Sequence, residues 1–208
     1  ERDTDNREQR LLAARDMSRR LWVAGSSHRG EEEILLAAFK SARARIPALS
    51  LVLAPRHPER FDEVEKLLQN SPFAFQRKSR ITTEEYFARD VLLLDTLGEL
   101  PEFFAAGDIA FVGGSLVNHG GHNVLEPARF EKPILFGPYM ANFRSIAEEM
   151  KQGGGAIEVH DAATLSCALV GLLVDSETRR QMGERACGVA RANREALALN
   201  LELAERYL

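Results

Sequence analysis

A glycine-rich stretch, residues 113–127, carries the residue types that best suit ligand binding. It reads GGSLVNHGGHNVLEP, follows an apolar segment (109–112) expected to be a buried strand, and leads into a helical pattern over about 124–130. Its four glycines, which allow positive φ angles and a close approach of the backbone to a ligand, are Gly113, Gly114, Gly120 and Gly121. A strand, a glycine-rich turn and a helix start together predict an anion site, because unpaired amides and the helix dipole both point into the turn.

Asn123 and Glu126 lie three residues apart, so their side chains share one face at the mouth of the predicted helix. Two interpretations stay open: the pair binds a ligand, or Asn123 caps the helix and Glu126 completes a variant of the capping box. The stretch has neither G-x-G-x-x-G nor G-x-x-x-x-G-K-[ST] spacing, so it is not a standard dinucleotide or triphosphate loop. Ser115 lacks the G-x-S-x-G surroundings of a hydrolase nucleophile.

His119 and His122, with Glu126 nearby, raise the alternative of a metal site. Metal ligands on a helix should share a face, whereas His119 lies in the turn before it. Recognition of hydroxyl and phosphate groups is therefore the preferred interpretation, and no bound metal is expected. Arg56 is the strongest candidate for a phosphate contact, because a planar guanidinium at a strand end can bind phosphate bidentately. The alternative for Arg56 is a salt bridge to a helix acid such as Glu59.

These residues are positioned by short apolar segments that alternate with helical patterns. The predicted strands are 21–24, 49–54, 73–76, 91–94, 109–112, 133–136 and 156–159. One predicted helix starts at Glu31, a second ends at Leu68 and a third ends near Ala106. Three more cover residues 142–152, a stretch from an Asp161 cap through Leu173, and about 176–207. Apolar runs in the strands are typical of a parallel sheet covered on both faces, so we predict a doubly wound, Rossmann-like α/β domain over 21–208. Residues 1–20 are expected to form a linker or an N-terminal helix.

Ligands bind at the edge where parallel strands end, and histidines are predicted to gather there. His28 follows the first strand, His57 follows the second, and His119 and His122 follow the fifth. Four of the five histidines are therefore expected on one rim, whereas His160 is expected to be a surface residue.

Composition limits the partners and the setting. The chain has 208 residues, 45% of them hydrophobic and 28% charged, with a net charge of −4, which is ordinary for a globular domain. No long basic run is present, so no nucleic-acid partner is expected. Cys167 and Cys187 fall in predicted helices without metal-like spacing, which fits a reduced cytoplasmic setting. We see no signal peptide or apolar run of membrane-spanning length, and the start without Met leads us to expect a fragment of a longer protein.

Five sequence blocks in a fixed order carry a family resemblance. They are WVAGSSH-x-GEEE (22–33), PRHPERF (55–61), DT-x-GEL (95–100), FVGGS (111–115) and GGHN-x-LEP (120–127). Together they resemble the Kdo transferases, the bacterial 3-deoxy-D-manno-octulosonic acid transferases of lipopolysaccharide synthesis. The resemblance runs from about residue 21 to the C-terminus, and ordered blocks are far more specific than a lone glycine loop. It implies the C-terminal, donor-binding half of a GT-B glycosyltransferase.

The resemblance also implies roles for individual residues toward the donor, CMP-Kdo. The residues assigned to the nucleotide are Pro55, Arg56, Leu97, Gly98, Glu99, Asn123, Val124, Leu125 and Glu126. Residues 55–56 would contact the cytidine nucleotide, 97–99 would line the base pocket through backbone groups, and 123–126 would hold phosphate and ribose, with Glu126 accepting hydrogen bonds from ribose hydroxyls. Candidate contacts to the rest of the donor are Ser26, His28, Gly114 and Ser115. No cofactor is expected besides this donor substrate.

The implied reaction is inverting, metal-independent transfer of Kdo to a lipid A precursor. Arg56 and the amides near Asn123 would stabilise the leaving CMP. The general base, the acceptor and any membrane contact are expected in an N-terminal half that this chain lacks, at the cytoplasmic face of the inner membrane. The fragment alone is expected to hold no catalytic residue. Family members commonly carry Glu where this chain has Arg29, which leaves the Kdo contacts near His28 unassigned.

Two other functions stay open beside this one. One is another GT-B transferase or a sugar-nucleotide epimerase that uses a different nucleotide, and the other is a non-catalytic nucleotide-binding domain on the same scaffold. An NAD enzyme is disfavoured, because GSSHRG (25–30) after the first strand does not match the dinucleotide fingerprint.

Overall fold

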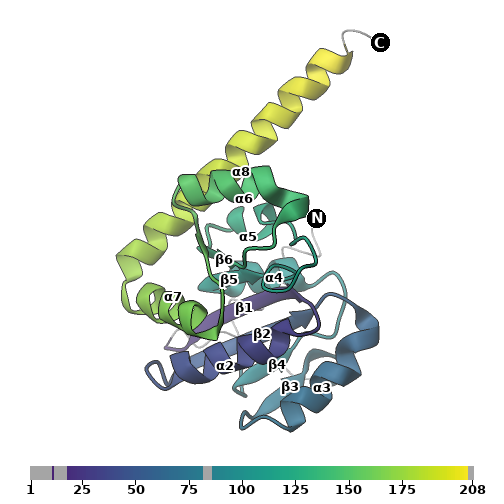
Figure 1. The fold of residues 1–208 in the computed structure, drawn as a ribbon, viewed down its shortest axis with the longest axis vertical. Helices are drawn as coiled ribbons and strands as arrows, with labels where there is room; N and C mark the ends of the chain where they lie inside the picture. Colours follow the sequence, from purple (N-terminus) through teal and green to yellow (C-terminus); the bar gives the residue numbers. More distant parts are fainter. Residues whose placement is uncertain (1–10, 12–17, 82–85, 206–208) are drawn as a thin grey trace.

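The computed structural model describes residue 11 and residues 18–81 and 86–205, with side chains as far as residue 196. Most of the linker or helix expected over residues 1–20 lies outside the described residues, as does the end of the last predicted helix beyond residue 205. A seven-stranded sheet forms the centre of the molecule, and helices cover both of its faces (Figure 1).

The sheet has the parallel, doubly wound arrangement that the sequence predicts. Its strands are β1 (Arg20–Ser27), β2 (Leu49–Pro55), β3 (Phe75–Arg77), β4 (Val91–Leu93), β5 (Ile109–Val112), β6 (Ile134–Phe136) and β7 (Ala156–Glu158). They lie in the order β3-β4-β2-β1-β5-β6-β7, and each neighbouring pair is parallel. All strands therefore end at one edge, and β1 lies at its centre.

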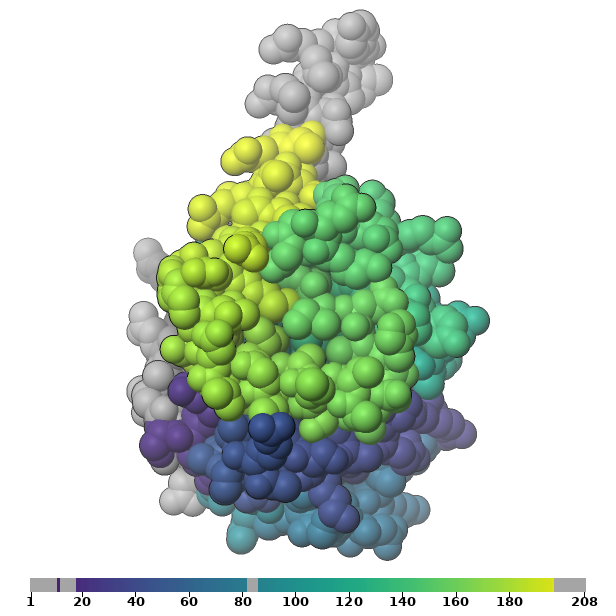
Figure 2. Space-filling view, turned by 60° about the vertical axis from the view of Figure 1, so that its left-hand side comes forward, coloured from purple at the N-terminus to yellow at the C-terminus, as the bar shows by residue number. Residues whose placement is uncertain are grey.

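Helices form two layers over the sheet. They are α2 (Glu31–Arg43), α3 (Phe61–Gln69), α4 (Leu100–Ala106), α5 (Leu125–Ala128), α6 (Arg144–Gln152), α7 (Ala162–Val174) and α8 (Ser176–Glu205), with 3-10 turns η1 (Pro58–Arg60), η2 (Lys78–Arg80) and η3 (Ala141–Phe143). Helices α2, α3 and α7 pack on one face, and α4, α5 and α6 pack on the other. Figure 2 shows α7 and the first part of α8 (yellow-green) beside α2 (dark blue), and the end of α8 extends beyond the body of the molecule in Figure 1.

Successive residues of β1 enter different cores, which explains why the strand is apolar throughout. Trp22 packs with Phe39 of α2 in the first core, whereas Val23 packs with Phe103 of α4 in the second. All four of these side chains are fully buried. Burial of each such side chain contributes about 1.5–3 kcal/mol, so the two layers fix β1 firmly in the middle of the sheet.

β1 is longer than predicted, and this sets the position of the site. It continues through Ser27, whereas residues 25–27 were expected in the following loop. Gly25 still pairs with strands on both sides, and the Ser27 carbonyl accepts a hydrogen bond from the Arg56 amide at 3.0 Å. Ser26 interrupts the register with a positive φ of 57°. His28 is consequently the first residue beyond the strand.

Other predicted boundaries move for local reasons. β3 begins at Phe75 rather than Phe73, and the Phe73 ring before it packs against Phe39 with centroids 4.8 Å apart. Helix α6 begins at Arg144 rather than residue 142, after the 3-10 turn η3. The Asp161 cap of α7 is confirmed, since its carboxylate accepts a hydrogen bond from the Thr164 amide in a full capping box.

Candidate functional site

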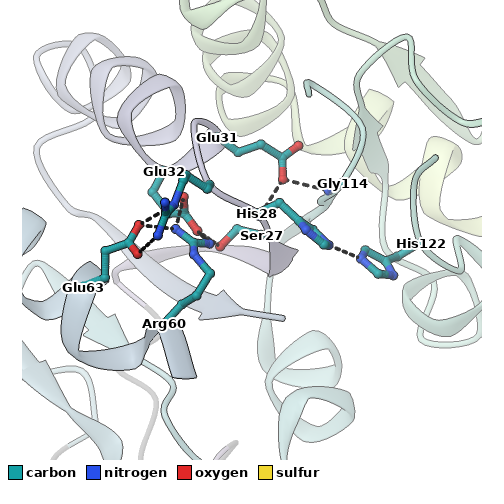
Figure 3. A network of polar contacts seen from close by, with 9 residues as sticks. Ser27, His28, Glu31, Glu32, Arg60, Glu63, Gly114 and His122 are labelled. Atoms are coloured by element: carbon teal, nitrogen blue, oxygen red, sulfur yellow. Dashed lines mark hydrogen bonds and ion pairs between the residues drawn. The ribbon is translucent and has the colours of Figure 1, made fainter. Parts of the chain in front are cut away.

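The four rim histidines meet in one cluster, as predicted from the strand ends. His28 stacks on His119 with ring centroids 4.3 Å apart, and its ring lies 5.2 Å from that of His57. The Nε2 atoms of His28 and His122 lie 2.8 Å apart, which is hydrogen-bond distance (Figure 3). We call these four residues the histidine cluster. His160 is exposed and lies near Glu158 at the end of β7, as a surface residue should.

The histidine cluster is an unfavourable place for further positive charge. Burial is the main cause that lowers the pKa of His28 to about 4, and the other three histidines and Arg60 contribute to the same shift. Burial also lowers the pKa of His122, with contributions from Arg56, His57 and His119. The neighbours that act on the two rings are therefore all basic.

Glu31 holds the glycine-rich turn against the start of α2, a role that we did not predict from the sequence. Its buried carboxylate accepts hydrogen bonds from the amides of Gly114 at 2.7 Å, Ser115 at 2.9 Å and Leu116 at 2.8 Å. The His28 amide donates a fourth at 2.9 Å. Burial raises the pKa of Glu31, and the four amide bonds oppose that shift.

The contacts of Glu31 correct the expected use of the turn. Its first amides were expected to be unpaired and open to a bound anion, but a carboxylate of the chain itself occupies those of residues 114–116. Ser115 is also fully buried, and its hydroxyl donates to the Val112 carbonyl at 2.5 Å and accepts from the Gly137 amide at 2.8 Å. These residues form the frame of the turn.

A second buried acid, Glu32, anchors the region between β1 and α3. It accepts two hydrogen bonds from Arg60, at 2.7 and 3.1 Å, and one from the Ser27 hydroxyl at 2.8 Å (Figure 3). Arg29, the residue that departs from the family pattern, is exposed and pairs with Glu63 of α3. Its guanidinium is therefore directed to α3.

Arg56 follows β2 and has an exposed guanidinium beside the histidine cluster. Within the part of the chain that the structure describes, this guanidinium makes no ion pair. The alternative of a salt bridge from Arg56 to Glu59 is wrong, since no such pair forms among the described residues. Glu59 lies 3.8 Å from His57 instead. Pro55 is buried as the last residue of β2 and pairs with Ser27.

Residues 97–99 form the turn between β4 and α4, next to the end of β2 in the sheet. Leu97 is 72% exposed, and Gly98 has a positive φ of 80° with open space on its Cβ side. Glu99 accepts a hydrogen bond from Thr96 at 2.8 Å and lies 3.3 Å from the Lys78 ammonium. The turn thus presents backbone toward solvent, one strand away from Arg56.

The structure rejects the capping box of Asn123 and Glu126, but Asn123 does bind the start of the helix. Val124 is the N-cap of α5 and makes no side-chain cap, whereas the Asn123 side-chain Oδ1 accepts a hydrogen bond from the Leu125 amide at 3.0 Å. Among the described residues, Glu126 makes no return hydrogen bond that would complete the box. Helix α5 is also shorter than predicted, since the chain turns at Glu131 with a positive φ of 57°.

Glu126 is a half-buried carboxylate without a hydrogen-bond donor among the described residues. Burial raises the pKa of Glu126, the nearby Arg129 opposes this shift, and Glu102 adds to it. Glu102 of α4 is itself buried, and one of its carboxylate oxygens has no hydrogen-bond partner among the described residues. We did not predict its burial from the sequence. An acceptor that is half removed from water and lacks a donor suits a ligand hydroxyl.

A cavity of about 290 Å³ lies beyond the end of β6, and Asn118 of the glycine-rich stretch contributes to its lining. It is lined by residues that include Asn118, Phe136, Tyr139, Met140, Arg144 and Glu158. Among the described side chains, no group of three or more His, Cys, Asp and Glu residues is arranged to hold a metal ion. None of the helices in the described ranges is both long and apolar enough to cross a membrane.

No protein-family model matches the chain. The 3-deoxy-D-manno-octulosonic acid transferase of Haemophilus influenzae is 42% identical to it over 193 residues, which are 91% of this chain and 44% of the relative. The chain therefore spans less than half the length of this curated relative.

Two solved structures show the relationship of the folds. Anabaena HepE in complex with UDP matches with a TM-score of 0.61 at 15% identity, over 98% of this chain and 51% of that one, which supports the expected GT-B half. The C-terminal CMP-Kdo binding domain of WaaA from Acinetobacter baumannii matches with a TM-score of 0.78 at 30% identity, over 90% of this chain and 96% of that domain. The chain belongs to the family of 3-deoxy-D-manno-octulosonic acid transferases.

Proposed function

We propose that the chain binds CMP-Kdo and is the donor half of a transferase that moves Kdo to a lipid A precursor. The observation that carries the proposal is the match to a CMP-Kdo binding domain over 96% of that domain's length. The basic rim supports it, because a nucleotide phosphate and a sugar carboxylate are both anions. Action at the cytoplasmic face of the inner membrane belongs to the same proposal.

The nucleotide would lie across the ends of β2, β4 and β5. Residues 55–56 contact the phosphate side of the nucleotide. Arg56 supports that role, because it is exposed and makes no ion pair with any described residue. The backbone of residues 97–99 lines the base pocket, for which the open side of Gly98 leaves room. Residues 123–126 hold phosphate and ribose, and the half-buried Glu126 carboxylate accepts hydrogen bonds from ribose hydroxyls.

The Kdo sugar would lie nearer to β1, against Ser26, His28 and Gly114. Ser115 acts on the donor only through the turn that it frames, because its hydroxyl is already bound on both sides. In the reaction, the acceptor hydroxyl attacks the anomeric carbon of Kdo, the bond from that carbon to the phosphate oxygen breaks, and CMP leaves with the bonding electrons. Arg56 stabilises the charge that develops on the phosphate, and the base that takes the acceptor proton comes from the other half.

Titration with CMP tests these assignments. We expect Arg56→Ala and Glu126→Ala each to weaken CMP binding by about tenfold to a hundredfold, as for loss of a hydrogen bond to a charged group worth about 1.5–3 kcal/mol. Arg45→Ala is the matched control for Arg56, because Arg45 is exposed before β2 begins, at the opposite edge of the sheet. Glu195→Ala is the matched control for Glu126→Ala, because Glu195 is exposed on α8. Unchanged CMP affinity in both rim variants would refute the assignment.

A further inference from the structure

The His28–His122 contact restricts how the two rings can be protonated. With their Nε2 atoms 2.8 Å apart, one Nε2 donates and the other accepts. The accepting ring then carries its proton on Nδ1, and the Nδ1 of the donating ring stays free. The pair can take up one more proton at that Nδ1 without breaking the contact. Uptake of a second proton would require two protonated Nε2 atoms to face each other.

The titratable groups that act on this pair are all basic. The basic groups that face it are His57 and Arg56 after β2, Arg60 at the start of α3, and His119 in the glycine-rich turn. The acids nearby are already engaged: Glu31 by four amides, Glu32 by Arg60 and Ser27, and Glu63 by Arg29 and Arg60. Glu59 is exposed and lies at the distance of a weak pair from His57. No described carboxylate is thus left to balance a proton on the pair.

Gly114 brings the backbone of the turn directly against both rings. A Cβ atom at this position would lie 3.1 Å from His122 and 3.3 Å from His28, and the residue has a positive φ of 67°. Glu31 fixes the same residue through its amide at 2.7 Å. The pair is therefore held in place by the frame of the turn (Figure 3).

We propose that the His28–His122 pair binds an oxyanion of the donor and takes up one proton when it does so. The inference rests on the proposed function. The anion supplies a negative charge beside the pair, where no described carboxylate is free to do so, and the added proton supplies a matching positive charge. The chemistry is that of a singly charged oxyanion, which in CMP-Kdo is either the phosphodiester or the Kdo carboxylate.

The test measures affinity against pH for ligands whose own charge stays constant. Cytidine 5′-(methyl phosphate) carries the phosphodiester alone, CMP-Kdo carries both anions, and cytidine carries neither. Calorimetric titrations run from about pH 5 to about pH 8, with the wild-type chain, His122→Gln, and the control His160→Gln. Imidazole NMR of His28 is recorded with and without the methyl ester and CMP-Kdo.

The affinity of the wild-type chain should fall as pH rises, by up to about tenfold per pH unit, because binding is linked to uptake of one proton. The slope should persist in His160→Gln and vanish in His122→Gln and for cytidine, and the pKa of His28 should rise from about 4 on binding. A slope with the methyl ester identifies the phosphodiester as the oxyanion, and a slope with CMP-Kdo alone identifies the carboxylate. Tight binding of both ligands with no slope, or with the same slope in His122→Gln, would overturn the inference while leaving the proposed function intact. If no cytidine compound binds, both the inference and the proposed function are wrong.

Discussion

Glu31 illustrates how far a residue's role can depend on contacts that are distant in sequence. As the first of three acids at the start of a predicted helix, it suits the helix dipole, and that local interpretation holds. Its carboxylate, however, binds amides 83, 84 and 85 residues away. Nothing in the residue types distinguishes Glu31 from its exposed neighbour Glu33, since only the folded sheet brings the turn within reach.

Replacement of Glu31 by Gln should destabilise the chain by about 1–3 kcal/mol or more, because an amide cannot accept four hydrogen bonds as a carboxylate does and presents a donor to the buried N–H groups. The free energy of unfolding in urea measures the change. Glu33→Gln is the matched control in the same helical turn, where the side chain is exposed. Equal stabilities of the two variants would contradict the assigned role.

The His28 imidazole makes stability depend on pH in a defined window. Its pKa is about 4 in the folded chain against an ordinary value of 6.5, so the unfolded chain binds the proton more readily. The stability that neutral His28 contributes is fully present above about pH 6.5 and is lost as pH falls through about pH 4.

Urea unfolding of the ligand-free chain at several pH values measures this loss. We expect the wild type to lose more stability than His28→Gln between about pH 6.5 and pH 4. His160→Gln, which removes an exposed ring, should follow the wild type. Parallel curves for the wild type and His28→Gln would show that His28 does not titrate with a lowered pKa.

At the scale of elements, the rim of histidines could be predicted because parallel strands all end at one edge. Knowing which residue follows each strand was enough to place His28, His57, His119 and His122 together. The strand ends themselves were less predictable. β1 extends to Ser27 because β5 pairs with it as far as Gly25 and β2 pairs with it as far as Ser27, and such pairing is not encoded in β1 alone.

Gly113 marks the closest approach between β1 and the glycine-rich turn. A Cβ atom there would lie 2.3 Å from the Ser26 carbonyl oxygen, which is backbone and cannot move aside cheaply. Gly113→Ala should therefore destabilise the chain by at least about 1–3 kcal/mol, as an overpacked core does.

Gly171→Ala in α7 is the control for this substitution, because nothing lies within 4 Å of the added methyl group. It should stabilise the chain by about 0.5–1 kcal/mol through helix propensity. Thermal or urea unfolding of both variants tests the pair. A tolerated Gly113→Ala would mean that β1 and the turn are not held at this separation.

At the scale of the whole molecule, the proposed nucleotide contacts all come from one rim of one sheet. Residues 55–56, 97–99 and 123–126 follow β2, β4 and β5, which are held by the same two packed layers. The chain should therefore bind the nucleotide without the remainder of the longer relatives, although transfer is expected to need that remainder. Charge distribution supports this division, because Arg56 at the rim makes no ion pair with any described residue.

The most direct measurement is calorimetric titration of this chain with CMP, UMP and AMP. We predict saturable binding of one CMP per chain, tighter than binding of UMP or AMP by about tenfold or more. The reason is that uracil or adenine would leave polar groups of a cytosine pocket without hydrogen-bond partners. Absence of CMP binding, or equal binding of the three nucleotides, would contradict the claim that this rim is a cytidine nucleotide site.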